Sequence, residues 1–432
     1  MFTTIRNAFK IPELRRKLLI SLFIIVLYRF GAVIPVPYIR SEILEDTFSA
    51  YAAQGNILAY MNILSGEAFS KATLFALSIS PYITASIVMQ LLTIAIPPLE
   101  RLSKSGEEGQ KKITQITRIV TVALGLVTAI GYYVLMRNYG AVTDTSFFTA
   151  VVIIACYSAG AALIMWMSEK INEHGIGNGI SLILFANIVA SAPTIIGYFW
   201  SVLTNTALRS WRFVIVEAIV VIAVAIVVFV VFITNSERRL PVQYAKKVVG
   251  RKMYGGQNSA LPIKLNMTGV MPIIFSSSIV SLPSTIIAFF NPSSDSFWYK
   301  VERFFSYNSP VYAILFFLLI IAFNYFYVAI SFNPVEVANN LKKNGGFIPG
   351  IRPGKPTSDY ISKVLGRITL IGALFLGFIA VFPIIVNMVS GSSLGSVAFG
   401  GSSLLIVVGV ALETVRELEA QMTMRHYKGF LE

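Results

Sequence analysis

Charged residues are scarce in this chain. Asp, Glu, Lys and Arg make up 13% of its 432 residues, whereas soluble domains carry about 25%. So few charges cannot give a globule of this size a water-compatible surface, and a hydrophobic content of 55% is the opposite of what disorder requires. The composition therefore excludes a soluble multidomain enzyme and a disordered chain, and it predicts a polytopic membrane protein.

Residues for metal, sulfur and catalytic chemistry are also few. The one cysteine, Cys156, lies in an apolar run, which excludes an intrachain disulfide and a cysteine-based metal cluster. With only His174 and His426, a histidine-rich metal site is not expected. His-Glu-x-x-His, Gly-x-Ser-x-Gly and phosphate-loop motifs are missing. We expect no cofactor and no enzyme activity, so work driven by ATP must come from a separate subunit.

Long apolar runs occupy most of the sequence. A helix that crosses a bilayer takes roughly 20 mostly apolar residues, because its backbone must be satisfied without water. Such windows predict ten spans: Leu18–Val36, Ala72–Pro97, Ile119–Met136, Phe148–Met167, Ile180–Trp200, Phe213–Thr234, Val270–Phe290, Val311–Phe332, Ile368–Val389 and Ser402–Leu412. The last window is short and requires its helix to continue past Glu413. Arg15, Arg16 and Lys17 precede the first window as in a signal peptide, but nine windows follow it, which favours a first span.

The basic residues orient these spans. Of 35 Lys and Arg residues, 27 fall in the terminal segments and the loops after even-numbered spans, whereas 7 fall in the loops after odd-numbered spans. Lys and Arg favour the cytoplasmic side, so both termini are predicted to be cytoplasmic. Ten spans divide into residues 1–200 and 201–432, with five spans each. An odd number per half predicts that two related halves have opposite orientations.

Polar residues within the predicted spans concentrate in the second and seventh spans. Such residues join helices or flank a water-accessible interior; here they are Thr84, Ser86, Gln90, Ser276, Ser277 and Ser278. Arg29 and Glu217 lie close enough to a span end to reach an interface, which argues against an ion-coupled carrier. The external residues 57–67 are mildly apolar but too short to span, and predict an interfacial or re-entrant segment.

Two predicted cytoplasmic loops are large and basic. They cover residues 235–267 and 333–367 and place apolar residues between basic ones. Topology explains their charge but not their length, so we expect them to dock on an anionic partner such as RNA phosphates, an acidic protein or lipid headgroups. The candidate docking residues are Arg238, Arg239, Lys246, Lys247, Arg251, Lys342, Lys343, Arg352 and Lys355.

Several motifs, collinear along the chain, resemble those of the SecY family, the channel subunits of the bacterial Sec protein translocase. Together they are highly specific, although no single motif would be. They are Tyr28–Gly31 with Ile34–Pro37, Pro81–Ile87, Gly175–Ser181, Asn340–Lys355, Gly401–Val408 and the tail Tyr427–Phe430.

The resemblance implies a fold and its site residues. The implied fold is all-α, with ten transmembrane helices as two inverted five-helix halves around a central hourglass pore. A ring of aliphatic side chains would narrow the pore: Ile83, Ile87, Ile180, Leu184, Ile274 and Ile406. A plug at about 56–70 would close the outer funnel, with Asn56, Ile57, Met61, Leu64, Gly66 and Phe69 as its residues. The six polar residues of the second and seventh spans would belong to a lateral gate.

The resemblance also implies a function and partners. The channel would pass unfolded secretory proteins across the bacterial cytoplasmic (inner) membrane and release transmembrane segments laterally, driven by SecA or a translating ribosome. Implied partners are SecE, SecG, the SecA ATPase, ribosomal RNA, signal peptides, unfolded preproteins and anionic lipids. A small-solute transporter would show paired intramembrane charges, and a membrane-embedded enzyme would show a nucleophile or metal constellation. The sequence has neither pattern.

Overall fold

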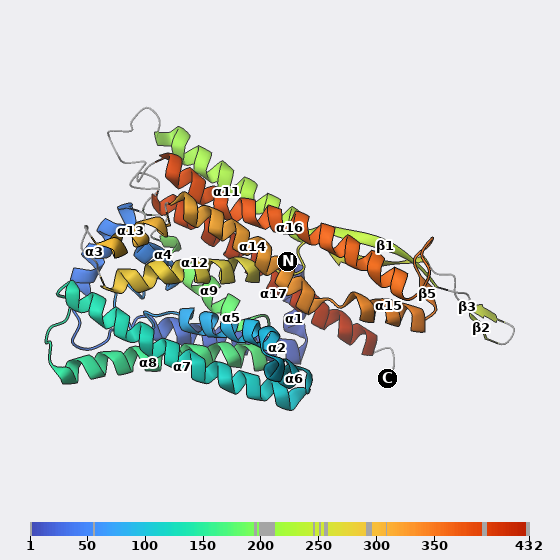
Figure 1. Cartoon of the computed structure of the whole chain (residues 1–432), viewed down its shortest axis with the longest axis horizontal. Coiled ribbons are helices and arrows are strands. Elements are labelled where there is room, and N and C mark those ends of the chain that lie inside the picture. Colours follow the sequence, from blue (N-terminus) through green and yellow to red (C-terminus); the bar gives the residue numbers. More distant parts are fainter. Residues whose placement is uncertain are drawn as a thin grey trace.

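The fold consists mainly of long helices that run side by side (Figure 1). The computed structural model describes residues 2–54, 57–193, 197, 212–244, 247–249, 252–254, 258–290, 296–307, 309–390 and 395–428. The long helices are α2 (Pro12–Gly31), α5 (Ser80–Ala95), α7 (Glu107–Asn138), α8 (Phe147–His174), α9 (Gly179–Ala190), α11 (Arg212–Asn235), α12 (Met271–Phe290), α14 (Pro310–Ser331), α16 (Lys355–Ser390) and α17 (Gly395–Lys428). Short helices flank them: α1 (Phe2–Lys10), α3 (Ser41–Gln54), α4 (Ile57–Leu64), α6 (Pro97–Lys104), α13 (Phe297–Phe304) and α15 (Pro334–Lys343).

Length and apolarity identify membrane spans among these helices. Within the described ranges, five helices qualify (α7, α8, α12, α14 and α16), and α5 passes the same test only when it is counted together with α6, from which it is bent by 100°. α9 and residues Val220–Asn235 of α11 are shorter apolar helices. Each of the ten predicted spans overlaps one long helix. The protein is therefore a multi-pass membrane protein.

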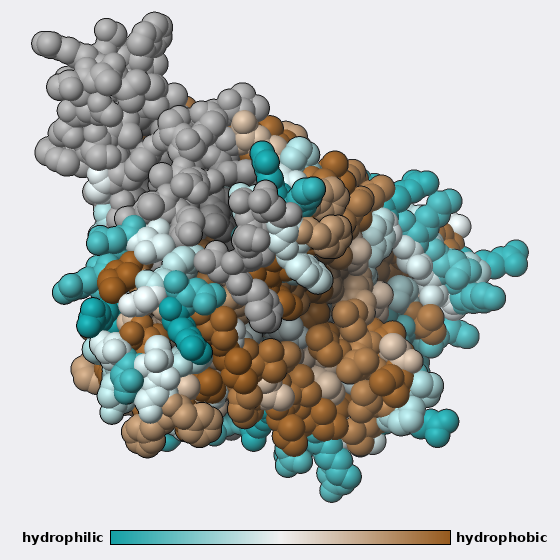
Figure 2. All heavy atoms as spheres, turned by 60° about the vertical axis from the view of Figure 1, so that its left-hand side comes forward, coloured by the Kyte–Doolittle hydropathy of each residue, from teal (hydrophilic) through white to brown (hydrophobic). Residues whose placement is uncertain are grey.

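The outer surface of the helices is apolar. Figure 2 shows a broad brown area with teal side chains toward its ends. Large apolar side chains that are more than half exposed include Phe30 of α2, Ile119 of α7, Phe232 of α11, Ile314 of α14 and Phe378 of α16. A patch of this extent on a soluble protein would cause aggregation, whereas lipid tails cover it at no cost. These faces therefore contact the bilayer.

The second span begins later than predicted. We expected Ala72–Pro97, but the helix α5 begins at Ser80, and the residues before it form turns. Ala72 and Ser78 have positive φ angles of 47° and 52°, which a right-handed helix excludes. Pro81 stands in the first turn of α5, where its missing N–H leaves no helical bond unmade.

The external segment is helical only in its first part. Within residues 56–70, the range of the expected plug, α4 ends at Leu64, and Gly66 and Glu67 follow with φ angles of 65° and 69°. Residues 65–79, called the return segment below, lead the chain back to α5. This segment lies against Gly160 of α8, where a Cβ would come within 2.1 Å of the Leu74 carbonyl oxygen. Only glycine permits so close an approach.

The two basic loops form one unit with strands that the sequence analysis did not expect. β1 (Glu237–Tyr244) pairs antiparallel with β4 (Asn258–Lys264), and β5 (Gly346–Phe347) joins the other edge of β1. β2 (Lys247–Val249) and β3 (Lys252–Tyr254) pair at the tip, at the opposite end of the molecule from α3, α4 and α13 (Figure 1). A buried core unites both loops with α14 and α16: Leu240, Val242, Ile263, Val328, Leu341, Ile348, Ile361, Leu365 and Ile368. The fold is thus mainly helical with a small sheet.

Candidate functional site

Six aliphatic side chains from four helices lie in one buried apolar cluster. They are Ile83 and Ile87 of α5, Ile180 and Leu184 of α9, Ile274 of α12 and Ile406 of α17. Each of them is at most 5% exposed. We call these six residues the aliphatic cluster. Two of the four helices come from each half of the sequence. They bring the predicted ring residues together within a single apolar core.

The start of α9 fixes two members of the cluster. Asn178 caps the helix, because its Oδ1 accepts hydrogen bonds from the N–H groups of Ile180 at 3.0 Å and Ser181 at 3.4 Å. Gly179 allows α9 to approach α8, since a Cβ there would come within 2.1 Å of a carbonyl oxygen of α8. Ile180 and Leu184 then share one helix face through their i, i+4 spacing. The Gly-rich motif thus positions this part of the cluster.

The segment 57–70 lies beside the aliphatic cluster. Leu64 packs against the apolar residues around the cluster, and Met61 packs against a neighbouring apolar core. Gly66 and Phe69 are buried. Two predicted plug positions carry no further description: Asn56 lies outside the described residues, as does the side chain of Ile57, the first residue of α4.

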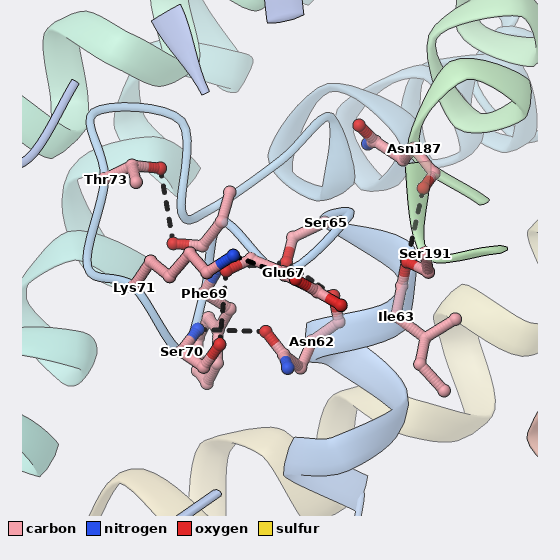
Figure 3. A network of polar contacts seen from close by, with 11 residues as sticks. Asn62, Ile63, Ser65, Glu67, Phe69, Ser70, Lys71, Thr73, Asn187 and Ser191 are labelled. Atoms are coloured by element: carbon pink, nitrogen blue, oxygen red, sulfur yellow. Dashed lines mark hydrogen bonds and ion pairs between the residues drawn. The ribbon is translucent and has the colours of Figure 1, made fainter. Parts of the chain in front are cut away.

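Hydrogen bonds connect the end of α4 to the turn that follows it (Figure 3). The Oδ1 atom of Asn62 accepts from the N–H of Ser70 at 2.9 Å, and the Oγ atom of Ser65 accepts from the N–H of Phe69 at 3.0 Å. The N–H of Glu67 donates to the carbonyl oxygen of Asn62 at 2.9 Å. These bonds make residues 62–70 a compact structure despite the early end of the helix.

Arg29 points inward, contrary to expectation. We expected its side chain to reach a membrane interface. In the structure its Nη1 atom is buried, and a Cβ on Gly66 would come within 2.7 Å of that atom. The guanidinium therefore lies beside the turn that follows α4, and its Nη1 atom has no hydrogen-bond partner among the described residues.

The serines predicted for the lateral gate bond within their own helix. Ser276 donates to the carbonyl oxygen of Pro272 at 2.6 Å, and Ser277 and Ser278 both donate to that of Ile274, at 2.8 and 2.9 Å. These hydroxyls therefore satisfy α12 instead of joining it to α5. Ser278 shares with Thr84 the lining of a small cavity of about 80 Å³ between α4, α5, α7 and α12.

A polar contact does connect α5 to α14. The hydroxyl of Tyr327 donates to Oε1 of Gln90 at 2.6 Å, and Nε2 of Gln90 donates to Oγ of Ser86 at 3.3 Å. The Tyr327 ring also packs on Phe275 of α12, with ring centroids 5.3 Å apart. Sequence reasoning selected Gln90 and Ser86 but missed Tyr327, whose only signal was a hydroxyl in an apolar span. A cavity of about 610 Å³ adjoins this contact between α5, α6, α7 and α14.

The predicted docking residues gather around the small sheet. Six are exposed: Arg238 and Arg239 of β1, Lys342 and Lys343 at the end of α15, Arg352, and Lys355 at the start of α16. Arg239 pairs with Glu237 at 2.7 Å. The carbonyl oxygen of Arg352 accepts from Thr357 Oγ1 at 2.8 Å, so its backbone is fixed while its side chain faces solvent. Lys246 and Arg251 lie outside the described residues, and only the backbone of Lys247 is described.

The fold and the site define a class: a polytopic helical membrane protein whose helices meet at a closed, apolar centre. Residues 73–415 match the model of the SecY family. The chain is 43% identical to the protein translocase subunits SecY of Streptomyces galbus, over 444 residues, and Mycobacterium bovis, over 449 residues, and each match covers 100% of both chains. The chain therefore belongs to the SecY family, a family of translocase channel subunits and not of enzymes.

Solved channel structures share this fold. A protein conducting channel matches 94% of this chain and 92% of its own, with a TM-score of 0.66 at 18% sequence identity. A SecY structure concerned with the plug domain and the closed state gives a TM-score of 0.64 at 19% identity, with the same coverage. Sec61 from a canine ribosome-channel complex gives 0.62 at 17% identity, again with 94% and 92% coverage.

Proposed function

We propose that the chain forms a channel for unfolded secretory proteins in the bacterial cytoplasmic membrane and also releases transmembrane segments sideways into the bilayer. The observation that carries this proposal is the aliphatic cluster, in which six buried side chains from α5, α9, α12 and α17 meet. A narrow apolar constriction excludes water and ions. Aliphatic side chains also make no directional bonds, so such a constriction accepts any passing side chain.

The arrangement of helices supports two five-helix halves around this constriction. In sequence order, α5, α7, α8 and α9 each pack on the next, and α12, α14, α16 and α17 repeat that pattern. α2 contacts α9 as α11 contacts α17. We propose that residues 1–200 and 201–432 form these halves, in opposite orientations in the membrane. The cluster would then lie between them, lined by two helices from each half.

The gate and plug roles are proposed on the same basis. α5 contacts α12 across the proposed boundary between the halves, and Gln90 with Tyr327 provides a polar contact to α14. Opening this seam would release an apolar segment into lipid. The segment 57–70 lies beside the aliphatic cluster and lines the cavity near Thr84 and Ser278 with Met61 and Leu64. It would therefore seal the external side of the resting channel.

The basic end of the molecule supports docking of the driving partner. We propose that the unit of β1, β4, β5 and α15 faces the cytoplasm and receives SecA or the ribosome, with both chain termini on that side. Its exposed cations suit an acidic protein surface or RNA phosphates, and anionic lipids would neutralise those nearest the membrane. SecE and SecG would cover part of the exposed apolar faces of the helices. A cytosolic motor or ongoing synthesis would supply the energy.

The experiment that tests the proposal makes the constriction polar. The double variant Ile83→Asn, Ile274→Asn places amides in the cluster from two helices, so water enters and the resting ion conductance of the reconstituted protein rises by about tenfold. Val88→Asn with Ile286→Asn is the matched control, because both residues lie on the same helices but are 38% and 54% exposed. A conductance in the cluster variant no higher than in the control contradicts the proposal.

A further inference from the structure

Asn187 of α9 connects the end of α4 to a helix of the aliphatic cluster. Its side chain is fully buried, at 0% exposure. Nδ2 donates to the carbonyl oxygen of Leu64 at 2.8 Å and to Oγ of Ser78 at 3.2 Å, and Ser78 Oγ donates to the same Leu64 carbonyl at 3.3 Å. Neither residue was selected from the sequence as a contact of this segment, because nothing in a single apolar span tells which carbonyl an asparagine faces.

The Leu64 carbonyl needs such a donor. The last carbonyls of a helix have no partner within it, and α4 ends at Leu64. Because this end of α4 is inside the protein, water does not replace the missing bond, and an unsatisfied buried carbonyl is costly. Two longer contacts between α4 and the cluster helices are weaker: Ser191 Oγ to the Ile63 carbonyl oxygen and Thr285 Oγ1 to Met61 Sδ, both at 3.5 Å. Figure 3 shows Ser191 next to Ile63, with Asn187 one turn earlier in the chain.

The return segment beyond residue 70 is fixed by other elements. Tyr157 of α8 donates to the carbonyl oxygen of Ala72 at 3.2 Å, and the N–H of Val36 donates to the same oxygen at 3.1 Å. The N–H of Leu74 donates to the carbonyl oxygen of Ile34 at 2.9 Å. These partners lie on α8 and after α2, and neither helix contributes to the aliphatic cluster. Residues 72–76 therefore form a base held by α8 and by the residues after α2, whereas Ser78 beyond it bonds to Asn187 of α9.

Resting on the proposed function, we propose that Asn187 is the positioning residue that keeps α4 in place while the cluster is closed. Leu184 of the cluster precedes Asn187 by about one helical turn. An outward movement of α9 that widens the cluster also withdraws Nδ2 from the Leu64 carbonyl. The end of α4 is then released, while Phe69, whose carbonyl oxygen accepts from Tyr132 of α7, and residues 72–76 stay. The contact thus links the width of the constriction to the position of the segment beside it.

Cysteine labelling tests this inference without any transport step. In a Cys156→Ser background, Met61→Cys reports on α4 and Ala76→Cys reports on the fixed base. Asn187→Leu keeps the side-chain size but removes the donor. Because interhelical hydrogen bonds in membranes each change an equilibrium about threefold to twentyfold, we expect maleimide to label residue 61 about threefold to twentyfold faster in Asn187→Leu, with no change at residue 76.

Two outcomes overturn the inference. Equal labelling of residue 61 in Asn187→Leu and in the parent shows that the contact does not hold α4, and faster labelling at both residues shows general loosening of the fold. Ser78→Ala removes the second donor to the same carbonyl. Its effect is therefore expected to be larger when added to Asn187→Leu than alone, because the double variant leaves the Leu64 carbonyl with neither donor. If Asn187→Leu does not fold, Ser78→Ala alone decides, by the same comparison of residues 61 and 76. Raised conductance of the cluster variant together with unchanged labelling would refute the role of Asn187 and leave the proposed function standing.

Discussion

At the scale of single residues, Tyr327 and Gln90 form a contact that we expect to hold the proposed gate closed. Their hydrogen bond of 2.6 Å joins α14 to α5, and the ring of Tyr327 extends the contact to α12 through Phe275. A hydrogen bond between membrane helices contributes about 0.6 to 2 kcal/mol. That is enough to favour a closed seam and little enough for an inserted apolar segment to overcome.

The variant Tyr327→Phe removes this bond and retains the ring. We expect the reconstituted translocase to accept a precursor with a defective signal sequence about threefold or more better than the parent, because the closed seam loses a bond of this size. Tyr325→Phe is the matched control. Its hydroxyl donates to the Gly366 carbonyl oxygen at 3.0 Å on another face of the same helix. If both variants discriminate between signals as the parent does, the contact does not control the gate.

Residue spacing predicted which side chains share a face, but not what they face. The i, i+4 spacing of Ile180 and Leu184 put both on one side of α9, and both enter the same core as Ile83 of α5. Asn187 and Tyr327 were missed because their partners lie 123 and 237 residues away in the chain. Arg29 was misplaced for the same reason, since Gly66, beside which its guanidinium lies, is distant from it in the chain.

At the scale of elements, apolar length predicted the helices well and their ends poorly. The late start of α5 depends on the positive φ angles of Ala72 and Ser78. Both residues have partners distant in the chain, since the Ala72 carbonyl accepts from Tyr157 of α8 and Ser78 bonds to Asn187 of α9. The strands were missed because β1 and β4 each contain a proline and lie in polar, basic loops, so they read as irregular structure. The pairing of β1 with β5 brings the two predicted docking loops into one surface.

The turn between β5 and α16 gives a prediction about docking. Arg352 is exposed there on a fixed backbone, and no ion pair found among the described residues includes it. Arg352→Glu reverses the charge without removing a packing contact, so we expect SecA-driven precursor transport to fall by about tenfold or more while thermal stability of the purified channel stays unchanged. Transport at the parent rate contradicts the docking assignment.

The control for this prediction is Lys300→Glu. It changes the net charge by the same amount, and Lys300 is exposed on α13 at the opposite end of the molecule (Figure 1). We expect this variant to transport normally, because a motor bound at the sheet does not reach that end. Equal losses in both variants would assign the effect to net charge and not to the docking surface.

At the scale of the whole molecule, the composition and the long apolar runs predicted the class of protein better than local sequence motifs did. Low charge and long apolar runs indicated a multi-pass membrane protein, whereas the division of ten spans into five and five stays a prediction. Neither composition nor span count predicts which side chains meet in a buried apolar core. That depends on four helices distant in sequence placing Ile83, Leu184, Ile274 and Ile406 in one core, which only the tertiary fold determines.

The most direct test of this account is disulfide crosslinking to a precursor stalled partway through the channel. In a Cys156→Ser background, single cysteines replace Ile83, Leu184, Ile274 or Ile406, and the precursor carries one cysteine at its midpoint. Val127→Cys and Phe378→Cys serve as controls on outer faces, where these residues are 63% and 64% exposed. We predict crosslinks at all four cluster positions and at neither control. Crosslinks at the outer positions without any in the cluster would show that the polypeptide takes another path.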